Sequence, residues 1–102
     1  MKLKYKDEEI SVTTTHNKTI MKYKYQKLYY AIIIEECNSY SSIASKQRVD
    51  IVMTDNNLKI LSIKRNMHEN TIYENNNATK TIILPINTFP NLEINTYFTI
   101  KY

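Results

Sequence analysis

Apolar and polar residues alternate along most of this chain, a pattern that predicts short β-strands. Residues 49–64 give the clearest example, because two arms rich in β-branched and apolar residues flank a central Asn-Asn pair. A symmetric turn at that pair would place Met53 opposite Ile60. It would also place Val52 opposite Leu61, on the other face of the hairpin. A hairpin that is apolar on both faces needs cover on both, so this segment predicts a packed β domain.

The remaining pattern predicts a mainly β protein, a small sandwich or partly open barrel of about seven short strands. Outside the hairpin, we expect strands over 2–5, 9–14, 22–26, 29–36, 78–86 and 97–101. Thr15 begins a possible capping sequence, which predicts one short helical segment near residues 15–21. Residues 37–48 read as a long connection or a ragged strand, and residues 66–77 as an irregular stretch. No linker or repeat divides the chain, so residues 1–102 are expected to form a single β domain.

Composition changes this picture at the turns, because the chain contains no glycine. Tight turns in a small β protein require several residues with positive φ, a conformation that glycine adopts at least cost. Asparagine is the next most tolerant residue, and the chain has twelve. We therefore interpret the asparagines as the turn-forming residues.

Cysteine content and apolar runs bear on where the protein is expected to be found. Cys37 is the only cysteine, which rules out an internal disulfide and favours a reducing compartment. The N-terminal residues carry no apolar signal-peptide region. The longest strictly apolar run, 31–34, is far too short to span a bilayer. The sequence thus predicts a cytoplasmic protein without a membrane span.

A possible ligand site centres on Asp50, which lies within the apolar strand of the hairpin. The regular hairpin pairing would place Asp50 opposite Ile63. A buried carboxylate requires a partner, and Arg48 or Lys64 could supply one. Asp50 could then anchor a ligand, together with Arg48, Tyr40 and Ser41 at the end of the sandwich. Alternatively, Asp50 could accept backbone N–H bonds from a neighbouring loop and hold that loop closed.

The net charge of +4 indicates an alternative function. Residues 1–28 contain seven lysines against three acidic residues, so the whole excess lies there. Lysines and tyrosines interleave in this part of the chain, as in sequence-tolerant binders of single-stranded nucleic acid. The candidate residues are Lys22, Tyr23, Lys24, Tyr25 and Lys27. If the segment is extended, however, tyrosines share one face and lysines the other, which favours inward packing of the rings and makes nucleic acid the less favoured partner.

Catalytic and metal sites lack their usual sequence patterns. The Walker, Rossmann and nucleophile-elbow motifs all require glycine, which is absent. His16, His68 and Cys37 do not have the spacing of zinc ligands, and no feature places Cys37 beside a histidine base. We therefore expect a non-enzymatic binding or accessory module with no metal and no cofactor. The protein could also bind through an exposed sheet edge, which can accept a strand of a partner protein or of a second copy of this chain.

Several segments, taken together, resemble a known family, the bacterial and archaeal domain of unknown function 192 (uncharacterised protein family 0127). The matching segments are Ile20-Met21, residues 31–39, residues 49–52, residues 78–87 and Asn95-Thr96. Asn57, Asn87 and Asn95 stand where the family has turn glycines. The family's polar-aromatic motif is replaced by residues 40–45, and its proline before the aspartate by Arg48. The resemblance implies a divergent, short, all-β sandwich-like member and no particular activity.

Overall fold

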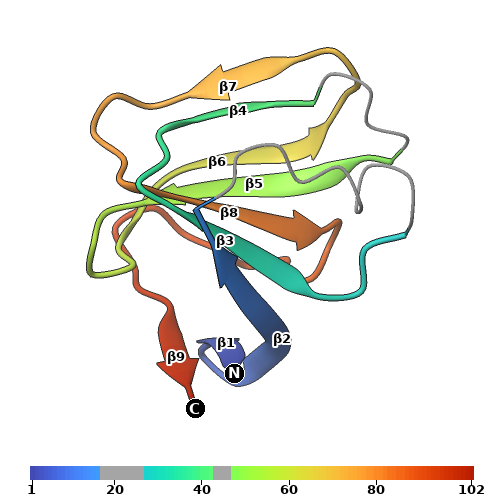
Figure 1. Ribbon diagram of the computed structural model, residues 1–102. Helices are drawn as coiled ribbons and strands as arrows, with labels where there is room; N and C mark the ends of the chain where they lie inside the picture. Colours follow the sequence, from blue (N-terminus) through green and yellow to red (C-terminus); the bar gives the residue numbers. More distant parts are fainter. Residues whose placement is uncertain (17–26, 43–46) are drawn as a thin grey trace.

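The structure, a computed structural model, describes residues 1–16, 27–42 and 47–102. Its strands are β1 (Lys2–Tyr5), β2 (Glu8–Thr15), β3 (Ala31–Glu35), β4 (Ser39–Ser41), β5 (Val49–Thr54), β6 (Ile60–Met67), β7 (Ile72–Glu74), β8 (Lys80–Pro85) and β9 (Thr99–Lys101). Seven strands form one sheet in the order β6-β5-β8-β3-β2-β1-β9, and β4 pairs with β7 in a second sheet (Figure 1). The prediction of a mainly β protein is confirmed.

The large sheet curls toward closure, which makes it a partly open barrel. All its strand pairs are antiparallel except β2 with β3. Its two end strands are joined by a bridge between Lys59, next to β6, and Tyr97, just before β9. The N–H of Ile60 also donates to the carbonyl of Thr96 at 2.7 Å, and Asn95 returns a bond to the carbonyl of Ile60. Backbone groups at the start of β6 are thereby satisfied without a further strand.

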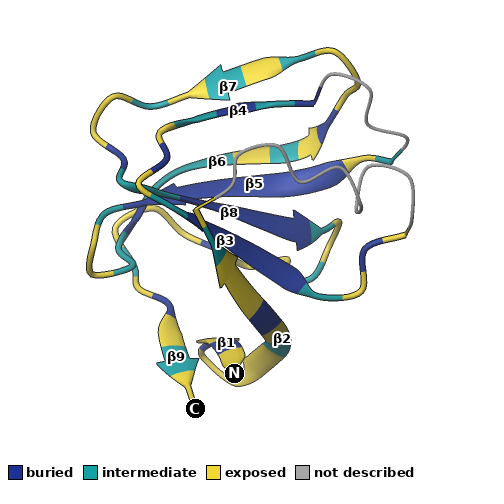
Figure 2. Cartoon of the chain, in the orientation of Figure 1, coloured by how far each residue is buried: buried dark blue, intermediate teal, exposed yellow. Residues whose placement is uncertain are grey.

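Strands β3, β5 and β8 consist mostly of buried residues (Figure 2). Their side chains alternate between two apolar clusters, one on each face of the sheet. The inner cluster, on the concave side, consists of Leu3, Tyr5, Val12, Ala31, Ile33, Val52, Ile60, Ile82, Leu84, Phe89, Leu92 and Phe98. The outer cluster consists of Leu28, Ile32, Ile34, Cys37, Tyr40, Val49, Ile51, Met53, Met67, Ala78 and Ile83. Since Val52 and Met53 fall in different clusters, the predicted cover on both faces of the hairpin is confirmed.

Different segments of the chain pack over the two clusters. The small β4–β7 sheet lies over the outer cluster, where Tyr40 is buried and its strand partner Tyr73 packs alongside (Figure 1). The inner cluster is closed by the segment between β8 and β9, which supplies Phe89 and Phe98. The ring of Tyr5 meets that of Phe98 edge to face at 5.7 Å, a favourable aromatic geometry.

Several sequence-based expectations about the elements were wrong. Thr15 is the last residue of β2 rather than the start of a helical segment, and no helix occurs in the described residues. Residues 17–21 of that segment, like the expected strand over 22–26, lie outside the described residues. In the described residues the large sheet has seven strands, and the small sheet adds β4, within the stretch interpreted as a connection or ragged strand, and β7, within the stretch interpreted as irregular. Each is only three residues long, too short to show a clear alternation.

The hairpin register also differs from the symmetric one. Thr54 pairs with Ile60, and Val52 pairs with Ile63 rather than with Leu61. The turn is longer than expected because one oxygen of the Asp55 carboxylate accepts two backbone N–H groups. The donors are Asn57 at 2.9 Å and Lys59 at 3.0 Å. A register shift between Met53 and Thr54 then offsets the two arms.

Asparagine does take most of the positive-φ positions. Asn87 (φ 63°) and Asn95 (φ 70°) adopt this conformation as expected, and so do Asn66 and Asn70. Asn57 does not, because the left-handed residue of the hairpin turn is Leu58 (φ 64°). Leu58 also packs against the inner cluster, so burial of its side chain offsets the unfavourable backbone conformation.

Candidate functional site

The four residues proposed as a ligand site do not converge. Asp50 is buried on the inner face of β5, whereas Arg48 is exposed just before that strand. Tyr40 is buried in the outer cluster, where desolvation raises the pKa of its phenol above the usual value. Ser41 is half-buried in β4, opposite Ile72. A single ligand cannot contact all four side chains.

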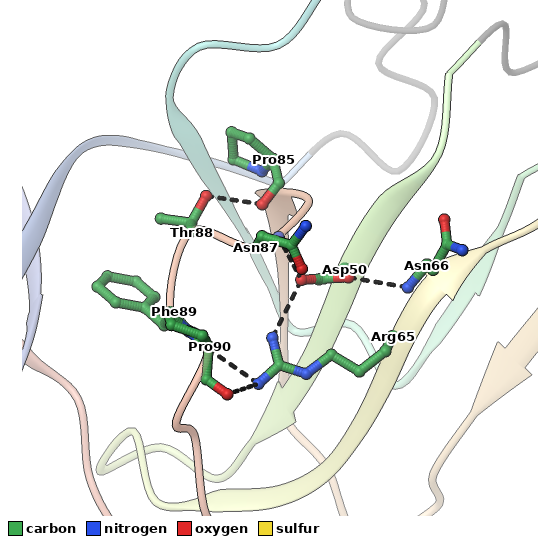
Figure 3. Close-up of polar contacts among 8 residues, drawn as sticks. All are labelled: Asp50, Arg65, Asn66, Pro85, Asn87, Thr88, Phe89 and Pro90. Carbon is green, nitrogen blue, oxygen red and sulfur yellow. Dashed lines mark hydrogen bonds and ion pairs between the residues drawn. The ribbon is translucent and has the colours of Figure 1, made fainter.

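Asp50 is instead the centre of a group of polar contacts with Arg65, Asn66 and Asn87, which we call the clamp (Figure 3). It does not face Ile63 as expected, because β6 carries a bulge that places Arg65 and Asn66 across from it. Its side chain is 2% exposed and accepts the backbone N–H of Asn66 at 2.8 Å. The second carboxylate oxygen accepts the backbone N–H of Asn87 at 3.0 Å and pairs with the Arg65 guanidinium at 3.1 Å. The partner is thus Arg65, not Arg48 or Lys64.

Arg65 extends this clamp to the segment after β8. Its second terminal nitrogen donates to the carbonyl of Phe89 at 2.9 Å and to that of Pro90 at 3.3 Å (Figure 3). Phe89 is thereby held in the inner cluster. Both oxygens of Asp50 have protein donors, so its geometry matches the role of holding a loop closed.

A different pair of predicted residues does come together. Arg48, from the proposed ligand site, and Lys27, from the proposed nucleic-acid segment, line one hollow of about 410 Å³. Of the described residues, Leu28, Gln47, Pro85 and Ile86 also line it. The Gln47 side chain fixes one wall by accepting the backbone N–H of Leu28 at 3.0 Å. Lys22, Tyr23, Lys24 and Tyr25 lie outside the described residues.

A second hollow of about 400 Å³ shares Gln47 and Arg48 and is also lined by His68 and Glu69. We call the two together the strand-end hollow, since they lie where β3 and β5 begin and where β6 and β8 end. Sequence reasoning did not include Ile86 in this site. His68 follows β6 and Ile86 follows β8, and only the sheet order brings those strand ends together.

The strand-end hollow combines positive charge with exposed apolar surface. Neither Lys27 nor Arg48 forms an ion pair within the part of the chain that the structure describes, and Glu69 is the acidic residue on its wall. Ile86 is 46% exposed on the same surface. The ring of Tyr29, 73% exposed, lies 5.5 Å from the Lys27 ammonium. These groups can hold an anion and cover an apolar or planar group attached to it.

The possible nucleophiles have structural contacts. The Cys37 thiol is buried and donates to the carbonyl of Ser39 at 3.0 Å. The Ser42 hydroxyl donates to the carbonyl of His68 and accepts the N–H of Thr71 at 2.9 Å, which ties β4 to the chain before β7. No group of three or more metal-ligating side chains occurs in residues 1–16, 27–42 and 47–102.

Comparisons of the chain with protein-family models, with curated proteins and with solved structures find no match. Within the described ranges, the structure contains no helix long and apolar enough to cross a membrane.

Proposed function

We propose that this protein is a non-enzymatic binding module that holds an anionic ligand in the strand-end hollow. The observation that carries the proposal is the juxtaposition of two cations without ion-pair partners in the described residues, Lys27 and Arg48, with the exposed side chain of Ile86. An arginine binds planar or tetrahedral anions in a directed way. The apolar wall adds area for the rest of the ligand.

The same proposal includes the cellular compartment, the family and the mode of association with a partner. A reducing compartment such as the cytoplasm is supported by the single cysteine, Cys37, a buried free thiol. Membership in domain of unknown function 192, and with it a bacterial source, rests on the sequence resemblance described above. Association with a partner strand would use β6 or β9, the two end strands of the large sheet.

Phenyl phosphate is a suitable probe, because it joins an anion to a flat apolar ring. Titration of ¹⁵N-labelled protein should shift the amide resonances of Lys27, Arg48, Ile86 and His68 in a saturable way. Inorganic phosphate should bind more weakly, since it leaves the apolar wall uncovered. Arg48→Gln should weaken phenyl phosphate binding about tenfold, the loss of one charge-assisted contact.

Lys64→Gln is the matched control, since Lys64 is an exposed lysine that does not line the hollow. It should leave binding unchanged. Absence of saturable shifts at millimolar phenyl phosphate would refute the proposed site. Covalent capture of Cys37 or a serine by activity-directed probes in the native protein would refute the non-enzymatic assignment.

Single-stranded nucleic acid is the second candidate ligand, and one observation favours it. Tyr29 is exposed beside Lys27, so a ring for base stacking and a cation for phosphate share one surface. Anisotropy titration with a labelled oligodeoxythymidylate should then show binding that weakens steeply with salt. Tyr29→Ala should lower the affinity about tenfold, within the range measured for loss of one stacking ring. Equal affinity of the wild type and Tyr29→Ala would dismiss this candidate.

A further inference from the structure

Strands β1 and β9 carry a second basic surface, separate from the strand-end hollow. The strand register places Lys2 directly opposite Lys101, and Lys4 follows on the same face of β1. All three side chains are exposed. We call these three residues the basic strip, and it lies on the face of β1 opposite the inner cluster, to which Leu3 and Tyr5 belong.

Like charges opposite each other in a sheet repel, so this pairing calls for an explanation. Lysine on an edge strand protects against edge-to-edge aggregation, which accounts for Lys101 on β9. It does not account for Lys2 and Lys4, because β1 lies between β2 and β9 within the sheet.

The basic strip carries a net positive charge even when Glu9, the acidic residue in register with it, is counted. Glu9 is the acidic residue in register with Lys4, and no ion pair joins them within the described residues. Lys2 donates to the Ser11 hydroxyl at 3.1 Å, a neutral partner. Thr99 adds an exposed residue with a second hydroxyl beside Lys4. The strip therefore combines three cations with hydroxyl groups, the side-chain types that contact phosphate oxygens.

We propose that the basic strip binds a linear chain of phosphate groups laid across β1 and β9. Lys2 and Lys4 are two residues apart on one strand, about 7 Å along it. A phosphate chain that runs along β1 can meet them in turn, while Lys101 contacts it from the side. A phosphate between Lys2 and Lys101 also screens the repulsion between the two ammonium groups. This lowers the free energy of the bound state in addition to the direct attraction between each lysine and the phosphate.

The phosphate chain can come from inorganic polyphosphate or from the backbone of a nucleic acid. Titrations with labelled polyphosphate and with a labelled oligodeoxythymidylate separate these sources. The strip contacts up to three phosphates, so log affinity for the oligonucleotide should fall with log salt at a slope of about −2. That slope corresponds to a loss of roughly fifteenfold between 50 and 200 mM salt. Binding that the lysine variant described next weakens would support the proposal, and the probe that binds would identify the source as polyphosphate or a nucleic acid.

The triple variant Lys2→Gln, Lys4→Gln, Lys101→Gln should bind about tenfold more weakly and reduce the salt slope toward zero. Lys64→Gln again serves as the control for loss of one exposed lysine elsewhere on the surface. The urea midpoint of the triple variant should not fall, since repulsion is removed, and this result shows that the variant still folds. No binding of either probe, or equal binding by wild type and triple variant, would overturn the proposal.

This proposal does not depend on the proposed function, and the two fail separately. Arg48→Gln should leave polyphosphate binding to the strip unchanged, while the triple lysine variant should leave phenyl phosphate binding in the hollow unchanged. If Arg48→Gln abolishes polyphosphate binding and the triple variant does not, the chain of phosphates binds at the hollow and the strip proposal is wrong.

Discussion

Replacing Asp50 by asparagine tests the clamp with almost no change in side-chain shape. The wild-type carboxylate uses both oxygens: one accepts the N–H of Asn66, and the other accepts the N–H of Asn87 and pairs with Arg65. Asparagine offers a single acceptor oxygen, and its amide nitrogen is a donor. Whichever way the amide turns, at least one backbone N–H faces another donor.

The size of the effect follows from these contacts. One buried N–H left without an acceptor costs about 1–3 kcal/mol. Loss of the ion pair adds less than about 1 kcal/mol, because the Arg65 side chain is 35% exposed and keeps its bonds to two backbone carbonyls. We therefore expect Asp50→Asn to lower the free energy of unfolding by about 2–3 kcal/mol, a large part of the roughly 5–15 kcal/mol of a typical domain.

Urea unfolding followed by tyrosine fluorescence and far-ultraviolet circular dichroism measures this loss. The urea midpoint should fall by on the order of 1 M. Asp55→Asn is the matched control, because Asp55 accepts both of its backbone N–H bonds through one oxygen, which asparagine retains. That control should change stability by less than about 0.5 kcal/mol, in the range of ordinary surface substitutions. Equal effects of the two substitutions would refute the reasoning about Asp50.

Two further predictions concern the backbone and the buried phenol. Asn87 has φ 63°, so Asn87→Gly should leave the urea midpoint nearly unchanged. Asn87→Ala should lower the free energy of unfolding by about 1 kcal/mol. Equal urea midpoints of the two variants would contradict this prediction. Burial raises the folded-state pKa of Tyr40, so its contribution is fully present below the unfolded pKa of about 10 and declines at higher pH. Between pH 8 and pH 11 the urea midpoint of Tyr40→Phe should fall less than that of the wild type, and equal falls would be the contrary result.

The sequence predicted the fold class because its strongest signals are local. The arms of the 49–64 hairpin are apolar on both faces, and burial on both sides of β5 follows directly from that composition. The absence of glycine likewise predicted asparagine at Asn87 and Asn95. It misplaced the positive φ of the hairpin turn, because the Asp55 carboxylate sets the loop length there.

The candidate site was predicted only in fragments. Lys27 and Arg48 appeared in two separate hypotheses, and neither contained Ile86. Their convergence depends on which strand ends lie next to each other, and strand order is not contained in the alternation of any single strand. Asp50 was correctly singled out as a buried carboxylate that needs partners, and a backbone N–H from a neighbouring loop was one of those expected. Arg65 was not predicted, because a bulge in β6 places it across from Asp50.

Alternation, β-branched residues and the glycine-free composition determined by themselves that this chain forms a β domain covered on both faces of its central strands. Tertiary structure alone decided the partner of Asp50, the pairing of Lys2 with Lys101, and the meeting of Lys27 with Arg48. The physical reason is distance along the chain: backbone preferences act between near neighbours, whereas these contacts join residues brought together only when the sheet closes.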